Sequence, residues 1–122
     1  MSKKIMVVDD SRIAQLQLQK ILAETDYEVA ACCQSGEEAL ETYDKVNPDL
    51  VTMDIVMPGM DGLEAARELL QKHPDARVLM VSSLAYDDTI NEAQRIGAKG
   101  FVYKPFDHDQ LLQAVQEAFL DD

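Results

Sequence analysis

Five short runs of mainly apolar residues divide the sequence, and this pattern restricts the fold more than any other feature. Four of them are almost continuously apolar, which is typical of strands covered on both faces. The segments between and after them place apolar residues three and four positions apart, the spacing of an amphipathic helix. Such alternation predicts an α/β fold with a parallel sheet and helices on both faces. The expected strands are Lys4–Val8, Glu28–Cys32, Leu50–Met53, Arg77–Val81 and Gly100–Tyr103.

Each expected helix has an apolar stripe and a residue that can begin it. The first stripe is Ala14, Leu18, Ile21 and Leu22. Gly97 follows the fourth expected helix, at the position where many helices end with a left-handed residue. Five strand–helix units are too few for a barrel, so we expect an open, doubly wound sheet in a single domain spanning residues 1–122. The expected helix caps are Ser11, Ser35, Asp61, Asp87 or Asp88, and Asp107.

The chain of 122 residues carries 23 acidic and 11 basic side chains, which gives a net charge of −12. This charge repels phosphate backbones, so direct nucleic-acid binding is not expected. No apolar stretch approaches the roughly 20 residues that a membrane helix needs, and the N-terminus does not resemble a signal peptide. We therefore expect a cytoplasmic protein without membrane insertion. The adjacent Cys32 and Cys33 would point to opposite faces of a strand, so we expect reduced, buried thiols.

Polar side chains lie where four of the expected strands end. Asp9 and Asp10 follow the first strand, Asp54 the third, Ser82 the fourth and Lys104 the fifth. Ligands of open parallel sheets bind beyond the carboxyl ends of the strands, so these residues predict one site. An Asp-Asp pair alone is more often a solvated turn or a helix cap, but the other strand ends favour a site. Three carboxylates in one small space require protons or a cation, and an open, oxygen-rich site suits Mg²⁺.

The strand ends belong to four longer motifs, which are VVDDS at residues 7–11, MDIVMPGMDG at 53–62, VSS at 81–83 and GAKGFVYKPF at 97–106. Together these motifs resemble the receiver domain of bacterial response regulators, and the similarity runs from Lys4 to Leu120. The resemblance implies a flavodoxin-like (βα)5 fold with strand order 2-1-3-4-5. It also implies a phosphorylation-dependent switch of a two-component system, of the chemotaxis type or another stand-alone type, and not an enzyme with external turnover.

The resemblance assigns roles to the acidic residues. Asp54 would accept a phosphoryl group from a histidine kinase or a phosphotransfer protein. Asp10 and Asp54 would bind Mg²⁺ directly, Asp9 would bind it through a water, and the backbone carbonyl of Val56 would be a further ligand. A carboxylate can form an acyl phosphate, and such transfer depends on positioning and charge neutralisation, which Lys104 would assist.

Two further residues are expected to detect the phosphoryl group. The hydroxyl of Ser82 can donate to a phosphoryl oxygen, and its movement would let neighbouring side chains repack. The resemblance matches Phe101 to an aromatic residue that changes rotamer when this hydroxyl moves, and plain core packing is the alternative interpretation. It also implies a cis peptide bond between Lys104 and Pro105, which X-Pro bonds tolerate.

Receivers contact their protein targets through the fourth helix, fifth strand and fifth helix. The residues expected on this surface are Ser82, Tyr86, Ile90, Phe101 and Tyr103. The paired acids and bases of winged-helix regulator dimers are missing there, so we expect a stand-alone receiver, either a monomer or a phosphorylation-dependent dimer. A receiver fragment of a larger regulator with an output domain would have the same sequence.

The main alternative of another class is an aspartate-nucleophile phosphatase. That class expects a second acid two residues after the nucleophile, where this chain has Val56. Val56 and Leu84 are also apolar where chemotaxis regulators carry an amide and an acid. With fewer polar groups to orient an attacking water, the acyl phosphate is expected to be longer-lived.

Overall fold

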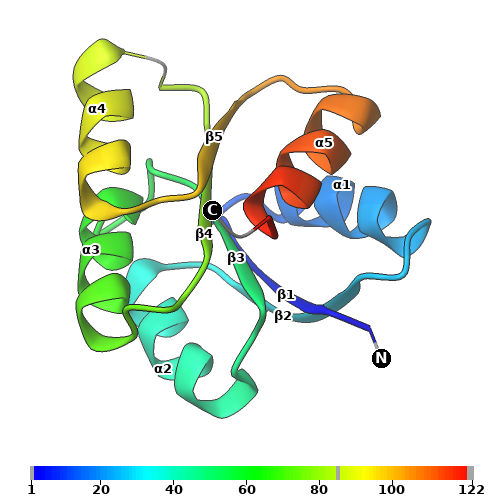
Figure 1. Ribbon diagram of the computed structural model, residues 1–122, viewed down its shortest axis with the longest axis horizontal. Coiled ribbons are helices and arrows are strands. Elements are labelled where there is room, and N and C mark those ends of the chain that lie inside the picture. The colour runs from blue at the N-terminus through cyan, green and yellow to red at the C-terminus, as the bar shows by residue number, and fades with distance from the viewer. Residues whose placement is uncertain (1, 85, 121–122) are drawn as a thin grey trace.

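Strands and helices alternate along the chain in the computed structural model, which describes residues 2–84 and 86–120 (Figure 1). The strands are β1 (Lys4–Val8), β2 (Glu28–Cys33), β3 (Leu50–Met53), β4 (Val78–Ser82) and β5 (Gly100–Tyr103). The helices are α1 (Arg12–Ala23), α2 (Gly36–Val46), α3 (Gly62–Lys72), α4 (Asp87–Ile96) and α5 (His108–Ala118).

The five strands form one parallel sheet in the order β2-β1-β3-β4-β5, which confirms the predicted flavodoxin-like topology. The strand order reverses at β1, because the chain passes from β1 outward to β2 and then returns to β3 on the other side. The carboxyl ends of β1 and β3 are therefore direct neighbours at the switch point of the sheet, where α/β folds bind ligands.

Helices cover both faces of the sheet, with α1 and α5 on one side and α2, α3 and α4 on the other (Figure 1). Successive side chains of β1 enter different cores, because side chains of a strand alternate between the faces. Ile5 and Val7 pack with α1 and α5, whereas Met6 and Val8 pack towards α2 and α3. Burial on both faces explains why the strand sequences are almost continuously apolar.

Four of the five predicted helix caps are confirmed. The side chains of Ser11, Ser35, Asp61 and Asp107 each accept a hydrogen bond from a backbone N–H of the first turn that follows. The prediction for α4 is wrong, because the capping position is Tyr86, whose side chain makes no such bond. Asp87 and Asp88 instead lie inside the first turn of α4, where the positive end of the helix dipole favours acids.

Three further boundaries or core assignments differ from the prediction. β2 extends one residue further, to Cys33, and β4 is Val78–Ser82 rather than residues 77–81, because Ser82 still pairs with Tyr103 of β5. On α1 the first buried side chain is Gln15 and not Ala14. Apolar spacing alone therefore missed a polar residue on the buried face of this helix.

Cys32 and Cys33 are both free thiols, and they lie on opposite sides of β2 as predicted. Burial raises the pKa of both thiols, which keeps them protonated at neutral pH. Cys33 is fully buried, whereas Cys32 is only half-buried and accepts a hydrogen bond from Gln19.

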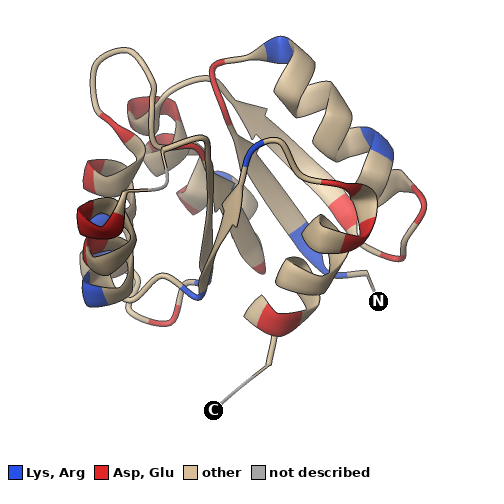
Figure 2. Cartoon of the chain, turned by 90° about the horizontal axis from the view of Figure 1, so that it is seen from above, with Lys and Arg blue, Asp and Glu red and all other residues tan. Residues whose placement is uncertain are grey.

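Within residues 2–84 and 86–120, none of the helices is both long and apolar enough to cross a membrane. Figure 2 shows acidic positions spread over helices and loops on several sides of the molecule. The net charge of −12 is therefore a property of the whole surface and not of one patch.

Candidate phosphoryl-transfer site

Three of the predicted site residues are each the first residue after a strand, and each is fixed by the same kind of backbone bond. Asp9 follows β1, Asp54 follows β3 and Lys104 follows β5. The backbone N–H of each donates to a carbonyl of the adjacent strand, so the ladder continues one residue past the strand. The acceptors, in order, are Cys33 at 3.0 Å, Val8 at 2.9 Å and Ser82 at 3.0 Å.

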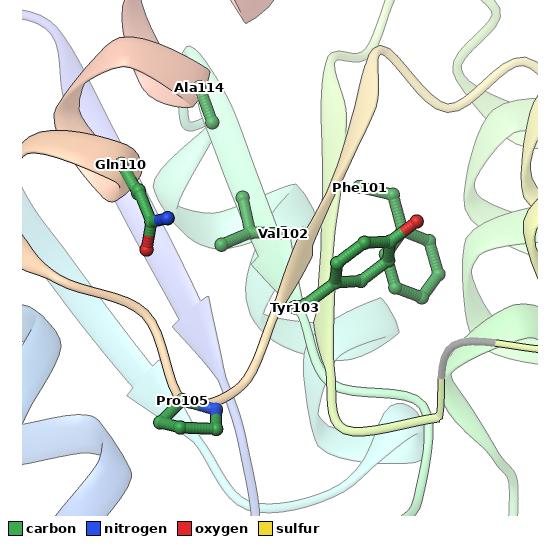
Figure 3. A pocket seen from close by; sticks show the side chains of 6 residues that line it. All are labelled: Phe101, Val102, Tyr103, Pro105, Gln110 and Ala114. Carbon is green, nitrogen blue, oxygen red and sulfur yellow. The ribbon is translucent and has the colours of Figure 1, made fainter.

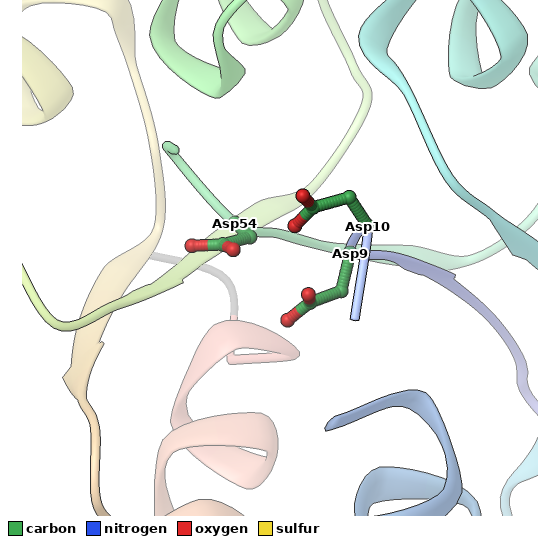
Figure 4. A group of neighbouring side chains, drawn as sticks. All are labelled: Asp9, Asp10 and Asp54. Atoms are coloured by element: carbon green, nitrogen blue, oxygen red, sulfur yellow. The ribbon is translucent and has the colours of Figure 1, made fainter. Parts of the chain in front are cut away.

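Asp9, Asp10 and Asp54 come together as predicted, and each offers a carboxylate oxygen within 4.8 Å of the others (Figure 4). Asp9 and Asp54 are buried, whereas Asp10 is exposed and opens the cluster to solvent. A set of carboxylate oxygens at the rim of a sheet fits a hard divalent cation such as Mg²⁺, which keeps several of its waters. The donor set therefore fits the metal that the sequence predicted.

Lys104 reaches across the site to both buried acids. Its Nζ lies 2.6 Å from Oδ2 of Asp9 and 3.4 Å from Oδ2 of Asp54. Each acid has a second partner, because Ser11 N–H donates to Oδ1 of Asp9 at 2.9 Å and Ile55 N–H donates to Oδ1 of Asp54 at 2.8 Å. The two carboxylates are thus oriented by fixed backbone donors, and the ammonium group lies against the remaining oxygens.

The electrostatics of the site favour binding of a positive charge. Burial raises the pKa of Asp54, the charge of Lys104 opposes this rise, and the nearby charge of Asp9 adds to it. Burial alone would lower the pKa of Lys104, but its hydrogen bond to Asp9 and the charges of Asp54 and Asp9 raise it. Lys104 is therefore firmly protonated, yet its single charge faces two buried carboxylates.

Ser82 is the last residue of β4 and is fully buried. Its Oγ accepts a hydrogen bond from the backbone N–H of Leu84 at 3.2 Å, and its carbonyl accepts from Lys104 N–H. Among the described residues, the Ser82 hydroxyl makes no hydrogen bond to any of the three acids. The backbone bond nevertheless places Ser82 directly beside Lys104 at the edge of the site.

The loop after Asp54 is held by an unusually close approach of α3. Gly62 N–H donates to the carbonyl of Ile55 at 2.8 Å. A Cβ atom on Gly62 would lie 1.9 Å from the carbonyl oxygen of Asp54 and 2.7 Å from its carbonyl carbon. Only glycine fits here, because the neighbouring atoms are backbone and cannot turn aside. Val56, two residues after Asp54, is 54% exposed and borders the site.

Four of the five residues predicted for the partner surface, Ser82, Ile90, Phe101 and Tyr103, lie in or beside β5, and Tyr86 precedes α4. The ring of Phe101 is half-buried and lies 5.4 Å from that of Tyr103, and a cavity of about 50 Å³ beside it is lined by Ile90. Tyr103 and Tyr86 are largely exposed. Figure 3 shows Phe101 and Tyr103 on one side of β5 and Val102 on the other. A second cavity of about 320 Å³ lies along β5 and α5, lined by Phe101, Val102, Tyr103, Pro105, Gln110 and Ala114.

Two further observations complete the site. The peptide bond between Lys104 and Pro105 is cis, which confirms the prediction. Gln15 on α1 was not assigned to the site from the sequence, although it is 1% exposed and donates to the backbone carbonyl of Asp9. Its position three residues before Leu18 and seven before Leu22 is the signal that would have placed it on the buried face of the helix.

The sequence of residues 5–116 matches the model of the response regulator receiver domain. The chain therefore belongs to the response regulator receiver family.

Among curated proteins, the chain is 41% identical to the chemotaxis protein CheY of Listeria monocytogenes over 115 residues, covering 94% of this chain and 97% of that protein. It is 36% identical to CheY of Thermotoga maritima, covering 96% and 98% of the two chains. Among solved structures, a chain of the CheX-CheY-BeF3-Mg²⁺ complex from Borrelia burgdorferi superposes with a TM-score of 0.94 at 33% identity, covering 98% of this chain and 90% of that one.

The family fixes the function at the level of class. The chain is a phosphorylation-dependent signalling switch of two-component systems, as the sequence predicted. Receiver domains are switches rather than classical enzymes, they bind Mg²⁺ at an acidic pocket, and they interact with kinases and downstream targets. The acidic cluster of Asp9, Asp10 and Asp54 is the corresponding feature of this chain.

Proposed function

We propose that Asp54 accepts a phosphoryl group from the phosphohistidine of a histidine kinase or a phosphotransfer protein. The observation that carries this proposal is the convergence of three carboxylates within 4.8 Å, with the ammonium group of Lys104 against the two buried ones. In the transfer, a bond forms between a carboxylate oxygen of Asp54 and phosphorus while the bond to the donor nitrogen breaks. The products are an acyl phosphate and a free histidine on the donor.

The residues of the chain prepare Asp54 for this step. Ile55 N–H holds one oxygen of the Asp54 carboxylate, which fixes the plane of the group. Lys104 opposes the rise in the pKa of Asp54 that burial causes, so it favours the ionised, nucleophilic form. Phosphoryl transfer needs positioning and neutralised charge more than it needs proton transfer, and Lys104 supplies one positive charge at the attacking carboxylate.

Asp9, Asp10 and Asp54, with the backbone carbonyl of Val56, are the residues that we propose to hold Mg²⁺. When bound, Mg²⁺ would neutralise carboxylate charge and bind oxygens of the transferred group. The exposed position of Asp10 leaves the cluster accessible to a donor from solvent. Ser11 N–H and Lys104 keep the Asp9 carboxylate in place from the other side.

The proposed output is a change in affinity for a protein target at the surface formed by α4, β5 and α5. The Ser82 hydroxyl would donate a hydrogen bond to the phosphoryl group, and Phe101 would repack next to the small cavity that it borders. Tyr86, Ile90 and Tyr103 would then present the altered surface. The naming of relatives from Listeria monocytogenes and Thermotoga maritima as chemotaxis proteins supports a chemotaxis-type role, as a monomer or a phosphorylation-dependent dimer.

Intact mass spectrometry after incubation with Mg²⁺ and acetyl phosphate tests the assignment. We expect one added phosphoryl group in the parent protein and none in Asp54→Asn. Asp26→Asn is the matched control, because Asp26 is an exposed acid outside the cluster, and it should be labelled like the parent. Full labelling of Asp54→Asn would falsify the site. Steady turnover of an external phosphomonoester by the parent would instead favour a phosphatase.

A further inference from the structure

Gln15 is a buried polar residue to which the proposed transfer gives no role. Within the described residues, the buried polar side chains are Asp9, Gln15, Thr52, Asp54 and Ser82. Three of these form the site, and Gln15 is 1% exposed in the second turn of α1, next to it. A buried amide is costly unless its donors and acceptor are paired, so its partners indicate what it holds.

All the hydrogen bonds of the Gln15 side chain go to the start of α1 or to the strand ends around the site. Its Nε2 donates to the backbone carbonyl of Asp9 at 2.7 Å and to that of Cys33 at 3.3 Å. Its Oε1 accepts from Nη1 of Arg12 at 3.3 Å. The carbonyl of Cys33 also accepts from Asp9 N–H, so Gln15 joins the ends of β1 and β2 at one point.

The carbonyl of Asp9 belongs to the peptide unit that connects Asp9 to Asp10. A peptide unit is rigid and planar, so fixing its oxygen fixes the directions in which both neighbouring residues continue. Figure 4 shows the two carboxylates leaving adjacent backbone positions in different directions. The carboxylate of Asp9 has its own partners in Ser11 and Lys104. Among the described residues, the Asp10 carboxylate has no hydrogen-bond partner, so its position depends on this peptide unit.

We propose that Gln15 is a positioning residue, which fixes the Asp9–Asp10 peptide unit and thereby holds the Asp10 carboxylate at the distance from Asp54 that cation binding requires. This inference rests on the proposed function of the acidic cluster. Groups that orient metal ligands without touching the metal typically change metal affinity by 10- to 100-fold when they are removed.

The test compares Gln15→Leu with Gln19→Leu. Gln19 lies one turn further along α1 and its amide donates to the thiol of Cys32, away from the acids, so it matches Gln15 in chemistry and in helix. Mg²⁺ affinity is measured by titration calorimetry, and unfolding by urea is measured without Mg²⁺. We expect Gln15→Leu to raise the Kd for Mg²⁺ by about tenfold. Gln19→Leu should leave the Kd within about twofold of the parent value.

The dependence of acetyl phosphate labelling on Mg²⁺ separates positioning from general damage. In Gln15→Leu the Mg²⁺ concentration for half-maximal labelling should rise about tenfold, while the rate at saturating Mg²⁺ returns to near the parent value. Gln15→Met keeps the length of the side chain without its polar atoms, and it should show the same effect if Gln15→Leu does not fold.

Three results would overturn the inference: an unchanged Kd for Mg²⁺ in a folded Gln15 variant, an equal loss of affinity in Gln19→Leu, or failure of both Gln15 variants to fold. Failure of the proposed function looks different, because the parent protein itself would then neither bind Mg²⁺ nor accept a phosphoryl group on Asp54.

Discussion

Replacing Gly62 by alanine should displace the backbone of Asp54 without removing any group that takes part in transfer. The added Cβ would lie 1.9 Å from the Asp54 carbonyl oxygen, whereas non-bonded heavy atoms prefer separations of about 3.5 Å. Asp54 or the start of α3 must therefore move by more than about 1 Å to relieve the overlap. The Asp54 backbone is anchored by its hydrogen bond to Val8, so the movement disturbs the site as well as the helix.

Two opposing effects set the change in stability of Gly62→Ala. Alanine reduces the conformational entropy of the unfolded chain relative to glycine, which favours it by up to about 1 kcal/mol. Overpacking against backbone costs up to about 3 kcal/mol, so we expect a net loss of about 2 kcal/mol in the free energy of unfolding. The effect on chemistry should be larger, because a misplacement of about 1 Å can lower a rate by about 100-fold.

The assay is the time course of acetyl phosphate labelling by intact mass at saturating Mg²⁺, paired with urea unfolding. Gly100→Ala is the matched control, because its Cβ would meet only the movable Cδ1 of Leu79, at 3.1 Å. We expect it to be labelled within about threefold of the parent rate, since a flexible side chain can yield. A folded Gly62→Ala protein that is labelled as fast as the parent would refute the argument that this contact fixes Asp54.

The remaining predictions concern charge and lifetime. The pKa of Asp54 is higher in the folded state, so its contribution to stability is present below the unfolded pKa and is lost as pH rises through the folded pKa. In the presence of a chelator, Asp54→Asn should therefore unfold at a higher urea concentration than the parent at pH 7, and the difference should shrink towards pH 4. Lower stability of Asp54→Asn at pH 7 would contradict this expectation. Lys104→Met leaves the buried Asp9 carboxylate without its ammonium partner, which is itself partly exposed, so we expect a loss of about 2 kcal/mol in urea unfolding without Mg²⁺. The exposed Lys99→Met should change stability by less than about 0.5 kcal/mol. Equal effects of the two substitutions would count against a stabilising ion pair between Lys104 and Asp9. Val56→Asn adds an amide that can orient water at the exposed rim of the site. One hydrogen bond of about 1 kcal/mol should speed phosphate release from the phosphorylated protein about fivefold. An unchanged rate of release would remove the basis for a long-lived acyl phosphate.

The positions of the site residues could be predicted because they depend on local patterns and on one topological rule. Apolar runs locate the strand ends, and the rule for parallel sheets brings Asp9, Asp54 and Lys104 to one edge. Residues whose role depends on tertiary contacts could not be predicted in the same way. The spacing of Gln15 from Leu18 and Leu22 indicates only that it lies on the buried face of α1, and the structure is needed to show that its amide pairs with backbone carbonyls.

Two other features could not be resolved from the sequence, the close approach of Gly62 to Asp54 and the start of α4. Gly62 was predicted to follow a helix cap, but its close approach to Asp54 depends on how α3 packs against the loop after β3. The start of α4 was misplaced because acids are favoured both at a cap and within the first turn, so Asp87 and Asp88 fit either position. The backbone of Tyr86, which is extended at φ −76° and ψ 146°, decides between them.

Backbone hydrogen bonds hold Asp9, Asp54 and Lys104 to the sheet one residue beyond their strands. The groups proposed for the chemistry are therefore positioned by the sheet, independently of the surfaces proposed to recognise partners. The spacing of the three groups is set by the sheet, in which hydrogen-bonded strands lie about 4.8 Å apart and β4 separates β3 from β5, and not by the outer faces of the helices. Exposed residues of α1, α4 or α5 can therefore be exchanged without moving the reacting atoms. Such a chain can acquire a new kinase or a new target by surface substitutions while its phosphoryl chemistry is inherited unchanged, and this makes its partner specificity a practical subject for redesign.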